Sequence, residues 1–364
     1  MNQSIKFRHI GMFSLALLAA GLPFAAPEVC KRALQEGLAL CGGPLLLSLF
    51  PFLVVSRLLI QCPESDLLAL PFRPVAALIG IHRPCAARVL CMGFLGGFAP
   101  AASAAAQAVK TGQLSSEEAD ALLPACVCSG PSFVVLTVGQ ALLGSTELGV
   151  LLFLAQITAG YLTAALLNRF PGQHPAVVQS GQPSEAEEAS LDGILADASV
   201  TYLKLCGFIL FFRMLAAGAG AFLPGMAGTL CAILLEVCSG CDLASRTGPW
   251  GSLLCCAALS VQGLSVLLQV RTLCPGEVSF RPLLAGRFLH LPLSLALFCL
   301  TWPEQAVETF GNLCERVIPM QRVPPDCALL AFAVCCMAAC ELNKGLLQRE
   351  KWRNKRTFPR RSAL

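Results

Sequence analysis

Glu236 is the side chain whose type and position point most directly to chemistry. It follows the apolar run 230–235 and directly precedes Cys238-Ser239-Gly240, where a helix is expected to break. A carboxylate inside an apolar segment is costly at membrane depth and usually faces a cavity or a partner. Two interpretations stay open. Glu236 binds a proton, a sodium ion or a polar substrate, or it forms a structural ion pair with Lys204 or Arg213.

Two glutamines form a second candidate group. Gln262 and Gln269 are seven residues apart, which places them and Ser265 near one face of a continuous helix. Amide side chains donate and accept hydrogen bonds, so they suit a heteroaromatic or carboxylate ligand. The alternative is hydrogen bonding between neighbouring helices. We favour ligand contact because this segment follows the interrupted one around Glu236.

Hydroxyl groups stand at both expected breaks, as Ser129 and Ser132 around Gly130-Pro131 and as Ser239 in the second half. Helix N-termini beside such breaks attract anionic groups, although a simple kink is the alternative. The predicted substrate-binding residues are therefore Ser129, Ser132, Glu236, Ser239, Gln262 and Gln269.

No pattern in the sequence supports catalysis or a bound cofactor. It contains no nucleophile–base pair, no phosphate-binding glycine loop and no HExxH motif, so we expect no enzyme. The 20 cysteines lie mostly in apolar runs, where cysteine acts as a small packing residue. Cys126-Val127-Cys128 and Cys238-Ser239-Gly240-Cys241 resemble zinc ligand pairs only weakly, so no metal site is predicted.

The elements that must position these residues are membrane helices. Of the 364 residues, 55% are hydrophobic and 13% are charged, and the mean hydropathy is +0.68. Ordinary soluble domains contain about 25% charged residues. The composition excludes soluble enzymes, disordered regulators and nucleic-acid binders, and it predicts an all-α polytopic membrane protein.

The first half is predicted to contain a re-entrant hairpin. Residues 1–43 form a first transmembrane helix over Ile10–Ala26, read as uncleaved rather than as a signal peptide, and an interfacial amphipathic helix from Pro27. Residues 44–169 form a first repeat that opens with a span over 45–60 and closes with a span over 148–167, for which Ser145 and Glu147 are a good helix start. Its hairpin joins short helices over 101–110 and 116–126, the second opened by a Ser115–Glu118 capping box. Broken backbone of this kind is tolerated in a membrane only where it lines a cavity or is buried in protein.

The second half has a similar organisation after a polar, acidic linker over 170–199. Residues 200–301 form a second repeat with broken helices over 225–241 and 252–270, between spans over 202–223 and 282–300. An external loop and a last transmembrane helix (327–342) occupy 302–343, and a basic cytoplasmic tail that binds anionic lipid occupies 344–364. Val127-Cys128-Ser129-Gly130 recurs as Val237-Cys238-Ser239-Gly240, which suggests an inverted repeat.

Several short motifs in this order resemble a known family. They are Gly93–Phe98, Lys110–Ala119 and Gly130–Phe133 in the first half, and Leu235–Gly240, Gly263–Gln269, Arg281-Pro282 and Arg287–His290 in the second. The chain resembles the YlbJ family of sporulation integral membrane proteins over nearly its whole length. Members of this family have nucleoside-recognition gate domains related to those of concentrative nucleoside transporters. Val127-Cys128 departs from the family pattern, which has asparagine just before the break.

The resemblance implies two gate-type repeats with re-entrant or broken helices in a multi-pass bacterial cell membrane protein, such as one of the outer forespore membrane. It implies transport of a small polar or anionic metabolite, with dipicolinic acid during spore formation as the leading substrate. The competing expectation is a non-transporting structural or interaction protein required for the spore cortex or for maturation. The expected partners are a small-molecule substrate and the lipid bilayer, with no nucleic acid, and a homo-oligomer is left open.

Overall fold

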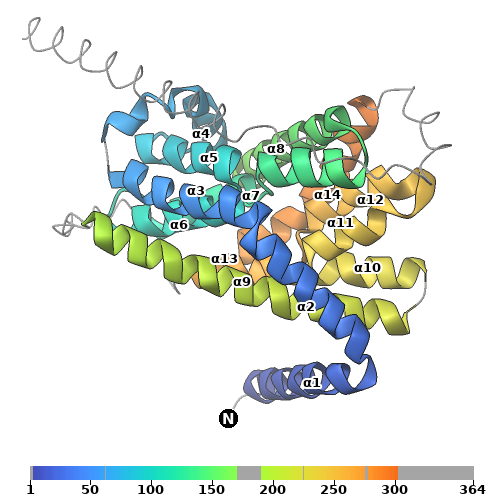
Figure 1. The fold of residues 1–364 in the computed structure, drawn as a ribbon. Helices are drawn as coiled ribbons and strands as arrows, with labels where there is room; N and C mark the ends of the chain where they lie inside the picture. Colours follow the sequence, from blue (N-terminus) through green and yellow to red (C-terminus); the bar gives the residue numbers. More distant parts are fainter. Residues whose placement is uncertain (1–2, 62, 170–189, 224, 275–277, 302–364) are drawn as a thin grey trace, which may run out of the picture.

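The computed structural model describes residues 3–61, 63–169, 190–223, 225–274 and 278–301. This part of the chain is built from helices, and no strand occurs in it (Figure 1). The predicted last span, the basic tail and residues 170–189 of the predicted linker lie outside the described residues.

Several helices are suited to crossing a bilayer. Four stretches are long and apolar enough, namely α8 (Thr146–Arg169), α9 (Leu191–Phe222), Gly248–Leu273 and α14 (Arg281–Thr301). Two bent helix pairs, each with an angle of 107°, raise the number to 6 if each pair is one span. The fold is therefore compatible with a multi-pass membrane protein.

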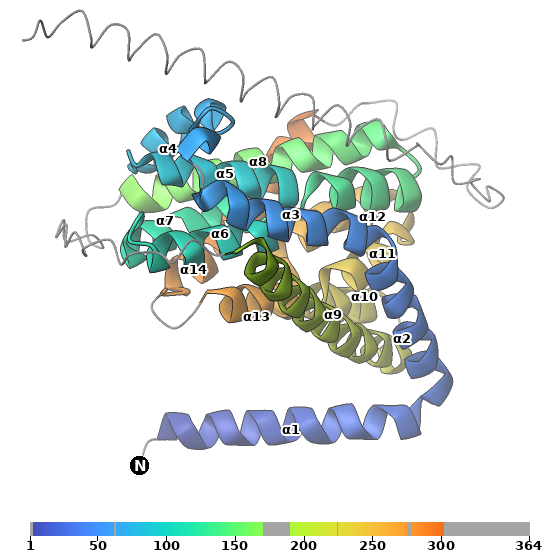
Figure 2. The same cartoon turned by 60° about the vertical axis from the view of Figure 1, so that its left-hand side comes forward.

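The N-terminal helices wrap one side of the molecule. α1 (Gln3–Ala25) stands off from the rest of the protein, and α2 (Pro27–Gly42) leads back to it (Figures 1 and 2). The predicted amphipathic helix is present as α2, and its small residues allow close packing on α9. A Cβ atom on Gly37 would lie 2.8 Å from the side chain of Leu210. α3 (Pro44–Gln61) follows and also packs against α9.

The first half contains the predicted pair of short helices, and a second chain reversal precedes them. Short helices η1 (Pro63–Asp66), η2 (Leu70–Phe72) and α4 (Arg73–Ile79) lead from α3 to α5 (Pro84–Gly96), which is followed by α6 (Phe98–Lys110) and α7 (Ser116–Cys126). Only Gly97 separates α5 from α6, yet the two helices lie side by side (Figure 1). The chain therefore turns back at Gly97, which adopts the left-handed φ of 81° that glycine tolerates.

The Ser115–Glu118 capping box is confirmed. The Glu118 amide donates to Ser115 Oγ at 3.1 Å, and the Ser115 amide donates to Glu118 Oε2 at 2.8 Å. This box starts α7 at the predicted residue. The turn at 111–115 joins the α5–α6 hairpin to α7, so the expected pairing of 101–110 with 116–126 describes only part of the hairpin region.

An unwound stretch at 127–130 follows α7, as predicted from Ser129-Gly130-Pro131. The chain then resumes as η3 (Ser132–Leu142), which has the wider π-type hydrogen bonding. The span α8 begins at Thr146, and Ser145 Oγ accepts from the Leu148 amide at 3.2 Å, which confirms the predicted start.

The predicted linker is wrong for residues 191–199, which belong to α9. Ser190 Oγ caps this helix by accepting from the Gly193 amide at 3.3 Å. Ile194 and Ala198 are buried, whereas Asp192 and Asp197 point outward. The acidic residues that suggested a linker are therefore the exposed face of a helix whose apolar face is packed.

The second half contains another hairpin and another interrupted helix. α10 (Met226–Leu235) and α11 (Val237–Ser245) lie side by side, and only Glu236 separates them (Figure 1). η4 (Gly248–Trp250) then leads to α12 (Gly251–Val261) and α13 (Gly263–Leu273), which are interrupted at Gln262. The predicted break at Cys238–Gly240 is wrong by two residues, because these residues form the first turn of α11 and the chain turns at Glu236.

The two halves meet along several helix pairs. α8 packs against α14, and α3 packs against α9. The halves also cross over, because α6 contacts α13 and α11 contacts η3. In Figure 1 the α5–α6 hairpin lies on one side of this junction and the α10–α11 hairpin on the other.

Candidate functional site

Two hairpin turns and two helix interruptions come together at the junction of the halves. A Cβ atom on Gly97 would lie 2.5 Å from the Gly130 amide nitrogen, so the first turn touches the unwound stretch of its own half. A Cβ atom on Gly263 would lie 2.9 Å from the Glu236 amide nitrogen, so the second turn touches the second interruption. The absence of side chains at both contacts lets backbone approach backbone.

A pocket lies beside these contacts. Its cavity has a volume of about 40 Å³ and is partly open. Its polar lining consists of Ser129, Ser132, Glu236 and Gln269, and its apolar walls include Leu45, Leu49, Phe98, Phe133, Ile209 and Val266. Four of the six predicted residues therefore line one pocket. The other two, Ser239 and Gln262, lie behind it and hydrogen bond to lining residues.

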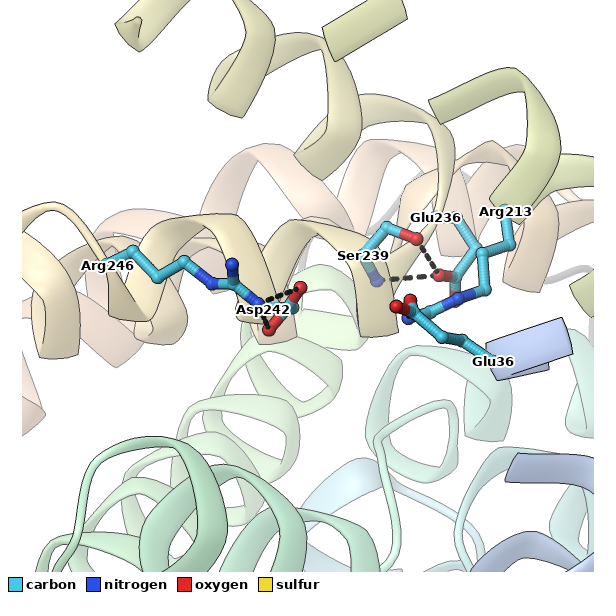
Figure 3. A network of polar contacts seen from close by, with 6 residues as sticks. All are labelled: Glu36, Arg213, Glu236, Ser239, Asp242 and Arg246. Carbon is cyan, nitrogen blue, oxygen red and sulfur yellow. Dashed lines mark hydrogen bonds and ion pairs between the residues drawn. The ribbon is translucent and has the colours of Figure 1, made fainter. Parts of the chain in front are cut away.

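Glu236 caps the helix that it precedes. Its Oε1 accepts from the Cys238 amide at 2.8 Å, and its Oε2 accepts from the Ser239 amide at 2.7 Å and from Ser239 Oγ at 2.8 Å (Figure 3). The side chain is 1% exposed. These contacts hold a carboxylate against the positive end of α11, and they explain why an acid is tolerated inside an apolar segment.

Of the two cations proposed as partners of Glu236, one is exposed and the other pairs with a different carboxylate. Lys204 is exposed on α9. Arg213 is buried, and its Nη2 pairs with Glu36 Oε2 at 2.8 Å, with the guanidinium lying beside the Glu236 carboxylate (Figure 3). The charge of Glu236 is thus balanced first by a helix end, and the ion pair that joins α2 to α9 belongs to Arg213 and Glu36.

Gln262 connects the two interruptions. Its Nε2 donates to the Leu259 carbonyl at 2.7 Å and to Ser129 Oγ at 3.3 Å. Gln262 is 1% exposed, and its Oε1 has no hydrogen-bond partner within the described residues. A buried acceptor in this state is costly and is well suited to a donor on a ligand.

The predicted single stripe of Gln262, Ser265 and Gln269 is wrong. Gln262 has a left-handed φ of 66°, so the helix does not continue through it, and the seven-residue spacing no longer places both amides on one face. Gln269 instead donates from Nε2 to Ser265 Oγ at 3.0 Å on the same helix. It still reaches the pocket, but from α13 alone.

Two helix starts of different chemistry line the pocket. Glu236 occupies the N-terminus of α11, so that terminus offers a carboxylate rather than free amides. η3 begins at Ser132 without a side-chain cap, and its first residues line the pocket. A ligand with both a donor and an acceptor would match the two helix starts.

Sequence reasoning missed Gly97 as a turn and Arg287 as a site residue. Arg287 is part of α14, and its guanidinium donates from Nη1 to the Ser260 carbonyl at 3.1 Å and from Nη2 to the Val127 carbonyl. An arginine within an apolar span was a usable signal, since such residues are costly and functional by default. The left-handed turn at Gly97 had a weaker signal in the pair Gly96-Gly97.

Within the described ranges, no three histidine, cysteine, aspartate or glutamate side chains gather to hold a metal ion. Comparison with models of known protein families, with curated proteins and with solved structures finds no match. The site is therefore interpreted from its own geometry.

Proposed function

We propose that this protein is a membrane transporter and that the pocket between the four helix interruptions is its substrate site. The observation that carries the proposal is that the turn at Gly97 touches Gly130, while Gln262 bonds to Ser129 and its neighbour Gly263 touches Glu236. Ser129, Gly130 and Glu236 line one pocket beside these contacts. Transporters bind their substrates at such interruptions, because unwound backbone and helix ends supply polar groups inside the bilayer. A purely structural membrane protein has no need of four interruptions at one point.

The two halves are proposed to be gate-type repeats. Each half consists of a long helix, a hairpin, an interrupted helix and another long helix, in that order. α3 to α8 form one unit, with α5–α6 as its hairpin, and α9 to α14 form the other, with α10–α11 as its hairpin. The contacts between halves support the proposal, because α6 with α13 and α11 with η3 are equivalent pairs in this alignment.

The substrate is proposed to be a small polar metabolite that carries both hydrogen-bond donors and acceptors. Glu236 would accept from it, and the start of η3 at Ser132 would bind an acceptor or a negative group. Phe98 and Phe133 in the pocket wall suit an aromatic ring. Dipicolinic acid, which the resemblance to the YlbJ family suggests, offers a ring and carboxyl groups. Its second carboxylate would be repelled by the Glu236 carboxylate, so a neutral nucleoside is compared with it in the transport assay.

The setting of this transport is proposed from the same resemblance. It suggests the cell membrane of a spore-forming bacterium, such as the outer forespore membrane, and a role in spore formation. The non-transporting alternative would retain the fold but show no substrate movement.

Uptake by liposomes containing the purified protein tests the proposal. Labelled dipicolinate and a labelled nucleoside should be compared in wild type, in Glu236→Gln and in Asp242→Asn. Asp242 is the matched control because it lies on the same helix, where it pairs with Arg246 at 2.8 Å on the surface (Figure 3). Saturable uptake that is lost in Glu236→Gln and kept in Asp242→Asn is the expected result. Absence of uptake of either compound, together with normal dipicolinate in spores that lack the protein, would favour the structural alternative.

A further inference from the structure

Arg287 joins the C-terminal ends of two helices that lie on opposite sides of the junction. Val127 is the residue that follows α7, and Ser260 is the last residue but one of α12. The Arg287 guanidinium donates to the backbone carbonyls of both, through Nη2 and Nη1 respectively. One side chain of α14 thus contacts the last turn of a helix in each half.

The charge of Arg287 fits this position. Within the described residues no carboxylate forms an ion pair with it. Carbonyls at the C-terminus of a helix carry roughly half a negative charge in sum. Two such ends together provide about one negative charge, which matches the one positive charge of the guanidinium. The planar fork of arginine can reach two acceptors in different directions, which a lysine ammonium does less well.

The two carbonyls stand directly before the residues that cross the junction. Ser129 is two residues after Val127, and Gln262 is two residues after Ser260. The hydrogen bond of 3.3 Å from Gln262 Nε2 to Ser129 Oγ therefore depends on how the ends of α7 and α12 are placed relative to each other. Gln156 of α8 supports the same point by donating to Ser260 Oγ at 3.0 Å and to the Cys256 carbonyl at 3.1 Å.

We propose that Arg287 is a positioning residue that holds together the two helix interruptions at 127–130 and 262, and so fixes Ser129 in the pocket lining. We call its two carbonyl contacts the Arg287 bridge. The proposal rests on the proposed function for its biological meaning, since these two hydrogen bonds matter for transport only if the pocket binds a substrate. The geometry of the bridge itself is independent of the substrate.

Cysteine labelling tests the bridge without any transport. Cys128 lies between Val127 and Ser129 and is 2% exposed. If the bridge holds this stretch, Arg287→Gln should increase the rate at which N-ethylmaleimide labels Cys128 by about tenfold or more, because hydrogen bonds to a charged group are lost. The rate is measured for each cysteine by mass spectrometry of peptides from the full-length protein in liposomes.

Two controls separate a local opening from general loosening. Cys30, which is 3% exposed in the packing of α2 on α9, should keep its labelling rate in Arg287→Gln. Arg88→Gln is the comparison variant, because Arg88 also donates to a carbonyl, that of Leu59 at 3.3 Å, away from the interruptions. Arg88 further bonds to Gln113 Oε1 at 2.9 Å and pairs with Asp66 at 3.3 Å, so its loss is at least as disruptive locally. It should leave the rate at Cys128 unchanged.

Arg287→Lys keeps the positive charge near the helix ends and should label more slowly than Arg287→Gln. An unchanged rate at Cys128 in Arg287→Gln, an equal increase at Cys30 or in Arg88→Gln, or equal rates in the lysine and glutamine variants would each overturn the proposal. In a transporting preparation Arg287→Gln should raise KM more than it lowers the maximal rate. If the wild-type protein transports neither compound, the proposed function is refuted, whereas the labelling rates still show whether the Arg287 bridge exists.

Discussion

Replacing Glu236 by glutamine tests the role of its carboxylate most directly. The carboxylate accepts three hydrogen bonds, one from the Cys238 amide and two from Ser239. Glutamine has one oxygen for these donors. If that oxygen faces Ser239, the Nε2 group faces the Cys238 amide, and two donors are left pointing at each other in a site where Glu236 is 1% exposed.

The free-energy loss can be assembled from the contacts. An unsatisfied buried donor costs about 1–3 kcal/mol. Removing the negative charge from the N-terminus of α11 costs roughly a further 0.3–1 kcal/mol, and up to about 2 kcal/mol in partly buried geometries. Glu236→Gln should therefore destabilise the protein by about 2–4 kcal/mol. Asp242→Asn removes an exposed i,i+4 ion pair, which contributes only about 0.3–0.5 kcal/mol.

Thermal unfolding in detergent, followed by near-ultraviolet circular dichroism, measures the difference. The fall in Tm for Glu236→Gln should be at least four times that for Asp242→Asn. Equal falls in the two variants would refute the reasoning, because they would mean that the Glu236 side chain does not accept these hydrogen bonds as an anion. The same samples, titrated with substrate, report whether affinity is lost together with stability.

Three further outcomes follow from the packing at the junction. In chemical unfolding, Gly97→Ala should destabilise the protein by roughly 2–5 kcal/mol, because alanine disfavours the left-handed backbone and its Cβ would clash with Gly130. Gly80→Ala should destabilise it by only about 1–2 kcal/mol, because the added Cβ meets nothing within 4 Å. Ser129→Ala and Gln262→Ala should show a coupling of about 0.5–1.5 kcal/mol in a double-mutant cycle of stability, and additive effects would contradict their hydrogen bond. Glu36→Gln should speed proteolysis of α2 at least several-fold, because its buried arginine partner loses an anion; unchanged cleavage would show that packing alone holds α2.

Local signals in the sequence predicted individual elements well. The capping box at Ser115 and Glu118 fixed the start of α7, and Ser145 with Glu147 fixed the start of α8. These signals work because a helix end satisfies its free amides with side chains only a few residues away. The all-helical class and the presence of several apolar helices followed from composition alone.

Errors arose where a single residue changes the direction of the chain. The short helices on either side of the turn at 111–115 are present as predicted, but the further reversal between α5 and α6, which Gly97 alone makes, was not predicted. Gln262 was expected inside a helix, because no sequence rule marks a glutamine as left-handed. The acidic face of α9 was read as a linker, since only the packing of Ile194 and Ala198 distinguishes a solvated helix face from an extended segment.

Four of the six predicted residues line one pocket, for reasons that were partly different from the expected ones. Glu236 and Ser129 were chosen because they stand beside breaks, and breaks do converge in this fold. Their partners depended on which helices lie next to each other, which the sequence does not reveal. For Glu236 a ligand and an ion pair were both left open, and its carboxylate accepts hydrogen bonds from the start of α11. Gln262 was expected to face a ligand together with Gln269 and instead reaches Ser129.

The Val-Cys-Ser-Gly sequence occurs twice, but its two copies occupy different positions in the fold. Val127–Gly130 is the unwound stretch after α7, whereas Val237–Gly240 is the first turn of α11. If the halves are repeats in the order of their elements, the counterpart of 127–130 is Gln262, and the counterpart of Glu236 is Gly97. The proposed repeat therefore depends on the order and contacts of the helices and not on these four residues. It also follows that the two hairpin turns differ in chemistry, because one is a bare glycine and the other a carboxylate. That difference leaves Glu236 as the one carboxylate among the residues that line the pocket, and the equivalent position in the first half brings no charge to balance it.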